Sequence, residues 1–183
     1  KRKNWDIERT LSRSHFSVQD LTFNCILIRA NTHLQTIAKT IGHQLPDELI
    51  ENMKKSEQAL DNLWDGFYKQ YYSRTFITHK LIKEPSLATL MPLYAGIIDK
   101  ERADELVKLL KSPKQFAAKF PVPSVPMNCS WYKELGYWQG PTWLNTNWLI
   151  ADGLERYGYT DEAEHIRKSS IALVDKNGPY EYF

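Results

Sequence analysis

The stretch from Gly136 to Tyr157 gathers side chains that combine broad apolar rings with hydrogen-bonding amides. These side chains are Tyr137, Trp138, Trp143, Trp148 and Tyr157, together with Gln139, Asn145 and Asn147. At helical spacing, Asn147 shares one face with Trp143 and Ile150. A buried amide costs free energy unless it is hydrogen-bonded, so this face either closes an internal hydrogen-bond network or lines a polar cleft. An aromatic-rich core helix that needs no ligand is the alternative.

One carboxyl group differs in its surroundings from the other acids of the chain. Most acids lie in charged runs such as DELIEN, DKERADE and TDEAE, which are typical of solvated helix faces. Glu181 instead lies between Tyr180 and Tyr182, after a Gly-Pro turn. A carboxyl group among uncharged rings is the type that general acid–base chemistry uses. The pattern alone nevertheless favours a residue at the rim of a C-terminal tail.

The elements that must position these groups read as helical hairpins. Gly140-Pro141 is a turn signal, and a helix is expected from about Pro141 to Tyr157, with Gly158 as its left-handed stop. Ile41-Gly42 before Asp47, Ala95-Gly96 before Asp99 and Tyr157-Gly158 before Asp161 repeat one arrangement of helix, glycine, short link and acidic cap. Asp161 with Glu164 also suggests a capping box. The sequence therefore predicts three helical hairpins and an all-α fold.

Two hairpins precede the aromatic stretch. Apolar residues recur near helical period over 17–41, which predicts a long, deeply buried helix, and a second helix begins at Pro46-Asp47-Glu48. Ser86 is expected to cap a helix that ends near Gly96, and Asp99 to cap the next one.

Two segments lack helical periodicity. Residues 66–83 are rich in Phe, Tyr, Thr and Ile, which predicts a short β-hairpin or an irregular insert. Pro121, Pro123 and Pro126 exclude a helix before the aromatic stretch and predict a long extended loop, the kind of segment that often carries function.

Composition narrows the class of protein. The chain has 183 residues, 42% of them hydrophobic, and a net charge of +2, which suits one domain with a real core. Acids and bases are interspersed, so we expect neither a nucleic-acid nor a membrane partner. The five histidines lack a metal-ligand spacing, so no metal is expected. Cys25 and Cys129 do not form a disulfide framework, which favours a reducing, cytoplasmic location.

The aromatic stretch carries a resemblance to a known family. YWQGPTWLNTNWLIADGLERYG, residues 137–158, resembles the Y-W-R-G-P-x-W-x-x-x-N-Y-L-L-x-x-G-L-x-R-Y-G signature of inverting glycoside hydrolases. That group contains mannosylglycerate and glucosylglycerate hydrolases and the mannosyl-oligosaccharide glucosidases of family 63. Shorter matching blocks are the segment starting at Asp20, Arg29-Ala30-Asn31, and the PLYAG and PVPS segments. The resemblance extends from about Asp20 to the end.

The resemblance implies a fold and a place for the chain in a longer protein. Its helical hairpins would form part of an (α/α)6 toroid, with the Gly136–Tyr157 segment on the inner ring. Residues 1–183 would be a single domain, the C-terminal portion of the catalytic domain. The first residue is Lys and the last follows an aromatic cluster, which also suggests a segment of a longer chain. The missing N-terminal part of the same protein is then an expected partner.

The resemblance also assigns roles. In this group the general base is the Glu of a Y-E-Y or E-Y-Y segment, which implies that Glu181 is the base of an inverting α-glucosidase or α-mannosidase that needs no cofactor. The substrate-binding residues would be Asp20, Tyr137, Trp138, Gln139, Trp143, Asn147 and Tyr180, acting on a carbohydrate by ring stacking or hydrogen bonding.

Two departures limit the resemblance. Trp5-Asp6 matches the end of the family's acid-bearing segment, so the general acid would fall upstream of Lys1. Gln139 stands where many members have Arg, and an amide offers no charged fork to an acidic aglycone such as glycerate. The alternative function from another class is a non-catalytic helical-repeat scaffold that binds a protein or a carbohydrate.

Overall fold

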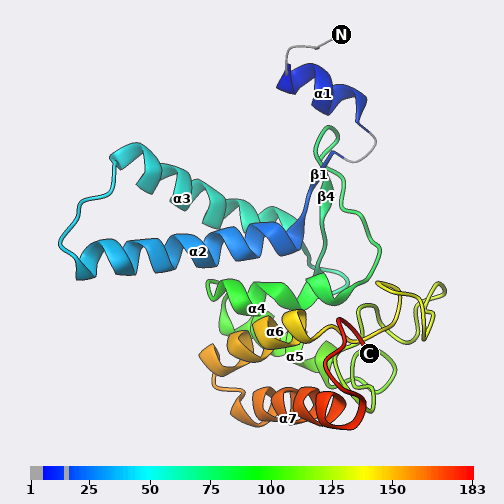
Figure 1. The fold of residues 1–183 in the computed structure, drawn as a ribbon. Helices are drawn as coiled ribbons and strands as arrows, with labels where there is room; N and C mark the ends of the chain where they lie inside the picture. Colours follow the sequence, from blue (N-terminus) through cyan, green and yellow to red (C-terminus); the bar gives the residue numbers. More distant parts are fainter. Residues whose placement is uncertain (1–5, 15–16) are drawn as a thin grey trace.

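A computed structural model of the chain describes residues 6–14 and 17–183 (Figure 1). The α-helices are α1 (Ile7–Arg13), α2 (Leu21–Thr40), α3 (Asp47–Ala59), α4 (Met91–Ala95), α5 (Lys100–Leu110), α6 (Leu144–Arg156) and α7 (Thr160–Asn177). Short 3₁₀ turns are η1 (Leu60–Leu63) and η2 (Leu87–Leu90). The short strands of the described residues are β1 (Val18–Gln19), β2 (Trp64–Asp65), β3 (Gln70–Tyr71) and β4 (Arg74–Thr75).

The three predicted hairpins are present as α2–α3, α4–α5 and α6–α7. Gly42, Gly96 and Gly158 adopt φ values of 67°, 75° and 81°, which is the left-handed backbone that ends each first helix. Helix α4 packs between α2 and α6, and α7 packs against α6 (Figure 1). A Cβ atom on Gly153 of α6 would lie 2.5 Å from the backbone nitrogen of Tyr94, so only glycine permits this approach of α6 to α4.

The predicted caps are partly confirmed. Asp99 accepts a hydrogen bond from the Arg102 backbone N–H at 2.7 Å, and Ser86 caps η2. Asp47 and Asp161 were wrongly predicted as caps, because α3 begins one residue earlier than expected and α7 two residues earlier. Both carboxylates therefore lie within the first turn, where their charge still favours the helix dipole but no side-chain cap forms.

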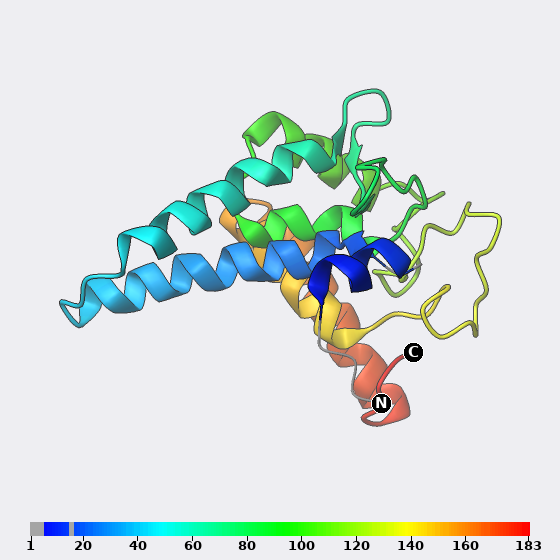
Figure 2. The same ribbon diagram turned by 90° about the horizontal axis from the view of Figure 1, so that it is seen from above.

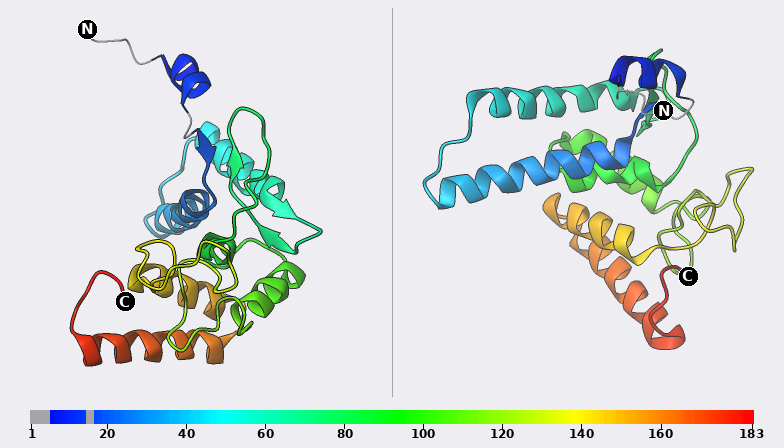
Figure 3. Two further views of the ribbon diagram at one scale, coloured as in Figure 1. Left: turned by 90° about the vertical axis from the view of Figure 1, so that its right-hand side faces the viewer. Right: turned by 45° about the horizontal axis from the view of Figure 1, so that its top comes forward.

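The prediction that the 17–41 helix is deeply buried was wrong for one side of α2. An apolar stripe on that side is exposed and consists of Phe23, Ile26, Leu27, Leu34, Ile37 and Ile41. The opposite side carries the buried Leu21, Cys25 and Ile28, which pack toward α4. Figures 1 and 3 show α2 and α3 at one edge of the row of helices, so no described element covers the stripe.

The β-rich insert is confirmed, with one long-range pairing that periodicity did not reveal. Strands β2 and β3 form a short hairpin, as predicted for this region. Strand β4 instead pairs with β1, which precedes α2 in the sequence. Helix α1 was not predicted either, because none of its residues is buried and it therefore shows no apolar stripe.

The connection from Ser112 to Thr142 contains no helix or paired strand beyond a single bridge between Pro123 and Thr142. Its turns extend away from the helices (Figure 2). The Asn147 side chain of α6 anchors it by accepting from the Val122 N–H at 3.0 Å and donating to the Pro121 carbonyl at 2.8 Å. Residues Pro121 and Val122 of the predicted proline loop are thus hydrogen-bonded to the first turn of α6.

Asp65 holds the β2–β3 hairpin through its carboxylate. One carboxylate oxygen accepts hydrogen bonds from the Phe67 and Tyr68 backbone N–H groups, and the other lies 2.7 Å from Lys83 Nζ. The bond from Lys83, followed by the backbone bonds, lowers the pKa of Asp65 below its ordinary value. The ionised form is therefore favoured in the folded chain.

We predict that Asp65→Asn lowers the free energy of unfolding by about 2 kcal/mol at pH 7. Because the folded pKa of Asp65 is depressed, its contribution is present above the unfolded pKa and is lost as the pH falls through the folded value. Urea titrations of both proteins at several pH values should show the difference shrinking in acid. Glu51→Gln, which removes a solvent-exposed pair with Lys55, is the control and should change little.

We also predict that Asn147→Ala lowers the free energy of unfolding by about 2 to 4 kcal/mol, because it leaves the buried Val122 N–H and Pro121 carbonyl unpaired. Asn145→Ala is the matched control on the same helix, since Asn145 is exposed and should change stability by less than about 0.5 kcal/mol. Equal losses in urea unfolding of the two variants would contradict the anchoring role.

Candidate functional site

The C-terminal tail is fastened to the beginning of α6. The Thr142 N–H donates to the Phe183 carbonyl at 2.7 Å, and the Phe183 N–H donates to the Thr142 carbonyl at 3.0 Å. Trp143 and Tyr182 form the adjacent antiparallel bridge. The Thr142 hydroxyl also donates to the Phe120 carbonyl at 2.9 Å. One residue therefore joins the tail and the proline loop, and it brings Glu181 to the N-terminal end of α6.

A cluster of four aromatic rings covers this junction; its members are Tyr137, Trp138, Trp143 and Tyr182. The Trp138 and Trp143 rings are stacked with centroids 3.7 Å apart and planes 5° apart. Tyr182 lies against Trp143 at 5.0 Å, and the edge of Tyr137 meets Trp143 at 4.9 Å. The loop and the tail are thus held together by ring contacts as well as by backbone hydrogen bonds.

The four rings differ in how much of each is exposed to solvent. Trp143 is 3% exposed, and its indole N–H donates to the Tyr137 carbonyl at 3.1 Å. Tyr137 and Trp138 are 49% and 42% exposed. In this structure Trp143 therefore supports the cluster, and Tyr137 and Trp138 supply the ring surface that a ligand can reach. Tyr137 has a φ of 54°, a left-handed backbone conformation that is uncommon for a residue other than glycine.

The two polar groups expected beside these rings are accessible. Glu181 is exposed at the tail, next to Tyr182 of the cluster. Gln139 is half-buried, and its backbone is fixed by hydrogen bonds with Lys133 and Gly136. The tail connection therefore places Glu181 next to Tyr182 in the chain, and the Tyr182 ring lies 5.3 Å from the ring of Tyr137. Tyr180 lies on the same tail, 65% exposed and edge-on to Phe183.

Two residues predicted to bind substrate are occupied with protein contacts. Asn147 is 1% exposed, and its amide also donates to the Ser170 hydroxyl at 3.0 Å, so it closes an internal network rather than lining a polar cleft. Asp20 is the N-cap of α2 and accepts from the Phe23 N–H at 2.8 Å. Their geometry supports positioning roles: one holds the proline loop and the other starts α2.

Sequence reasoning missed Tyr182 and Thr142. Tyr182 belongs to the ring cluster, and its aromatic type beside Glu181 was a visible signal, although its partner Trp143 lies far away in the sequence. Thr142 gave no signal, because its role depends on main-chain bonds to Phe183 and on a hydroxyl bond to Phe120. Of the motif that suggested the upstream acid, Trp5 lies outside the described residues, and Asp6 caps α1.

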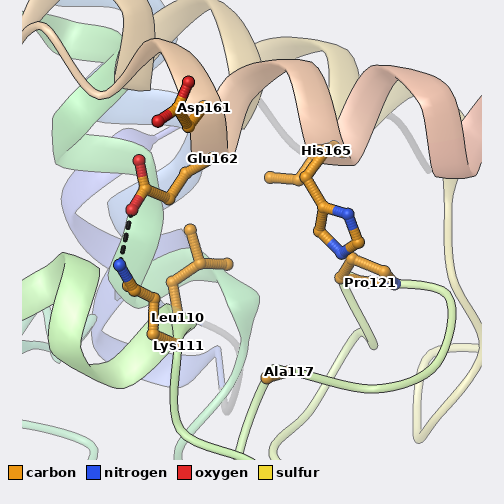
Figure 4. Close-up of a pocket in the computed structure, with 8 residues that line it drawn as sticks. Leu110, Lys111, Ala117, Pro121, Asp161, Glu162 and His165 are labelled. Atoms are coloured by element: carbon orange, nitrogen blue, oxygen red, sulfur yellow. Dashed lines mark hydrogen bonds and ion pairs between the residues drawn. The ribbon is translucent and has the colours of Figure 1, made fainter.

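A cavity of about 330 Å³ lies on the outer side of the molecule, between the end of α5 and the beginning of α7 (Figure 4). Figure 4 shows His165 above Pro121 and the ion pair between Lys111 and Glu162, with Nζ and Oε1 2.7 Å apart. The residues lining this cavity include neither Glu181 nor a ring of the cluster. We therefore place the candidate site at the aromatic cluster and not at this cavity.

The described part of the chain supports neither a metal site nor a membrane-spanning helix. Within residues 6–14 and 17–183, no three His, Cys, Asp or Glu side chains gather as they would around a metal ion. None of the helices described is both long and apolar enough to span a bilayer.

Comparisons with known proteins identify the family of the chain. The family model for the mannosylglycerate hydrolase MGH1-like glycoside hydrolase domain matches residues 1–183. The chain is 33% identical to a mannosylglycerate hydrolase of Rubrobacter radiotolerans, over 99% of the chain and 42% of that protein. It is 31% identical to one from Thermus thermophilus, over all of the chain and 44% of that protein. The chain thus spans less than half the length of these relatives.

Solved structures show the same fold. The chain superimposes with a TM-score of 0.91 on the crystal structure of a GH63 mannosylglycerate hydrolase from Thermus thermophilus in complex with glucose, at 30% identity. That match covers 98% of the chain and 42% of the other protein. The neutral trehalase Nth1 of Saccharomyces cerevisiae matches with a TM-score of 0.71 at 17% identity, over 91% of the chain and 34% of that protein, which shows the fold alone. The hairpins are those of part of an (α/α)6 toroid, and the chain belongs to the mannosylglycerate hydrolase MGH1-like glycoside hydrolase family.

Proposed function

We propose that this chain supplies the general-base half of an inverting glycoside hydrolase, with Glu181 as the base. The observation that carries the proposal is the fastening of the tail: Thr142 pairs with Phe183 and Trp143 with Tyr182, which fixes the backbone next to Glu181 at the ring cluster, where Tyr182 contacts the exposed Tyr137. A carboxylate next to ring faces suits a sugar bound by stacking, with a water molecule on the side of the carboxylate.

In the proposed reaction Glu181 takes a proton from that water, which attacks the anomeric carbon as the glycosidic bond breaks. A second carboxyl group must donate a proton to the leaving oxygen across roughly 6.5 to 9.5 Å. If Trp5-Asp6 matches the end of the family's acid-bearing segment, this general acid would lie upstream of Lys1, so we assign it to a part of the protein outside the chain. The reaction needs no metal or organic cofactor.

The substrate class proposed is a small α-linked glucoside or mannoside. Relatives are named mannosylglycerate hydrolase and, at 22% identity, glucosylglycerate hydrolase. Gln139 lies beside Trp138 and can donate to and accept from sugar hydroxyls. Since its amide carries no charge, a glycerate carboxylate would need a cationic partner elsewhere in the protein.

We further propose that residues 1–183 are one domain, the C-terminal portion of a toroid that other hairpins complete. Both edges of the row of helices support this. At the α2 edge the apolar stripe is exposed, and at the α6–α7 edge Trp148 and Ile171 are 63% and 60% exposed. These two residues line a groove of about 340 Å³ with Leu144 and Ile166. Contiguous exposed apolar faces are typical of interaction surfaces.

The alternative of a non-catalytic scaffold is less well supported. A helical-repeat scaffold would hold its aromatic residues in hairpin cores, whereas Tyr137 and Trp138 lie on a loop with their rings accessible.

The free thiols of the buried Cys25 and the half-buried Cys129 favour a reducing, cytoplasmic compartment for the protein. Burial raises the pKa of Cys25, so this thiol is not a competing nucleophile.

We predict that Glu181→Gln in the longer protein lowers kcat by about 10²- to 10⁴-fold and leaves KM and Tm nearly unchanged, because the amide keeps its volume but cannot accept the proton. Hydrolysis of mannosylglycerate, glucosylglycerate and short α-glucans should be measured. Glu134→Gln, another exposed glutamate on the neighbouring loop, is the control and should retain activity. Proton NMR of the first product should show inversion; a retained anomeric configuration would refute the mechanism.

We also predict that the isolated 183-residue chain does not hydrolyse these substrates at a detectable rate, since only one carboxyl group of the pair can be assigned to it. Adding the upstream part of the protein, fused or as a separate polypeptide, should restore turnover. The readout is glucose or mannose release by coupled assay. Turnover by the isolated chain that survives Glu181→Gln would show that the base has been misplaced.

A further inference from the structure

Residues 133–140, which include the two exposed rings of the cluster, form a loop that is braced at its base. The Lys133 N–H donates to the Gln139 carbonyl at 2.7 Å. The Gly140 N–H donates to the hydroxyl of Ser124 at 2.9 Å, and Ser124 is 2% exposed. A Cβ atom on Gly140 would lie 2.1 Å from the Lys133 carbonyl oxygen, so the two ends of the loop are in close contact. The loop is therefore a closed turn with a defined geometry.

Two polar side chains leave this loop on the same side. A Cβ atom placed on Gly136 would lie 2.7 Å from the Lys133 Cβ and 3.0 Å from the Gln139 Cβ. The Lys133 and Gln139 Cβ atoms are thus less than about 6 Å apart, close to the separation of directly opposed side chains in a sheet. Lys133 is exposed and Gln139 is half-buried. The loop therefore presents an ammonium group and an amide side by side, together with the rings of Tyr137 and Trp138.

Both polar groups are available to a ligand. Among all residues that the structure describes, none forms an ion pair or a hydrogen bond with the Lys133 ammonium or the Gln139 side-chain amide, and this includes the neighbouring Glu134. A single ammonium matches the one charge of a carboxylate better than the nearly two charges of a phosphate monoester. The amide beside it can donate to a carboxylate oxygen or exchange hydrogen bonds with a hydroxyl. The pair therefore suits a hydroxylated carboxylate.

We propose that Lys133 determines the specificity of the site by binding the carboxylate of an anionic aglycone, with the Gln139 amide beside it. The inference rests on the proposed function and names the cationic group that a glycerate aglycone requires. The Tyr182 ring lies 5.3 Å from the Tyr137 ring, so this loop contacts the tail one residue from Glu181. In an inverting reaction the aglycone leaves on the side away from the attacking water, so its binding group is expected on the loop and not on the tail.

Selectivity between two substrates that differ in one charge tests the proposal. The probes are the α-glucosides and α-mannosides of glycerate and of glycerol, in which a CH₂OH group replaces the carboxylate. In the longer protein, Lys133→Met should lower the ratio of kcat/KM for the glycerate substrate to that for the glycerol substrate by about 10-fold or more, because a charge-assisted hydrogen bond is lost. The loss should appear in KM, since the carboxylate is bound equally in the ground and transition states.

Two further variants separate the charge of Lys133 from its contribution to the loop. Lys133→Arg keeps the charge and should keep most of the preference for the glycerate substrate. Lys114→Met removes another exposed lysine of the connection between α5 and α6 and should leave the preference unchanged. Added salt should narrow the difference between wild type and Lys133→Met, because an exposed ammonium is screened. A preference that survives Lys133→Met, an equal fall for both substrates, or a wild-type protein without the preference would overturn the proposal.

A binding measurement decides the proposal even if the longer protein is inactive. Lysines dimethylated with carbon-13 keep their charge, and the Lys133 resonance is assigned by its disappearance in Lys133→Arg. D-Glycerate should shift this resonance, whereas glycerol should not. A protein that hydrolyses both glycosides without a charge preference and without this shift refutes only this inference. An inactive protein whose Lys133 resonance responds to D-glycerate refutes only the proposed function.

Discussion

The hydrogen bonds between Thr142 and Phe183 are the constraint on which the candidate site depends. They fix the last residues of the chain to the beginning of α6, and the Thr142 hydroxyl extends the connection to Phe120 in the proline loop. Asn147, one turn further along α6, holds the next residues of that loop. Two segments without regular structure thereby acquire a defined position from a helix. The rings of Tyr137, Trp138, Trp143 and Tyr182 pack only because these anchors bring their backbones together.

The helices that carry the site derive their stability from one row of contacts, in which α4 lies between α2 and α6. The close approach at Gly153 and the buried face of α6 complete that row. The same arrangement leaves apolar residues exposed at both edges, on α2 and on α6–α7. The interior of the row is thus covered by the chain itself, whereas the apolar faces at its two edges are not. The exposed apolar residues therefore belong to the first and the last hairpin of the row.

Much of this fold follows from local rules that the sequence displays. Helical period and glycine stops predicted the three hairpins, and they placed Asn147 and Ile150 on the buried face of α6 with Trp148 on the other. Periodicity did not separate a covered apolar face from an uncovered one, since both sides of α2 carry the same residue types. Nor did it reveal pairings that depend on the third dimension, such as β1 with β4 or Tyr182 with Trp143. The choice between network and cleft at Asn147 likewise depended on Pro121, which is distant in sequence.

The fastening of the tail through main-chain atoms also determines which changes the segment tolerates. The Thr142–Phe183 bonds involve no side-chain atom of Phe183, so any residue with a backbone N–H, that is any residue except proline, can stand at position 183 without altering the register. The length between Glu181 and Phe183 is not free in the same way, because the pairing of Tyr182 and Phe183 sets the register. Alternate residues of an extended segment face opposite sides, so a single insertion or deletion between Glu181 and Phe183 would turn Glu181 toward the opposite face. The tail therefore tolerates substitution far better than insertion or deletion.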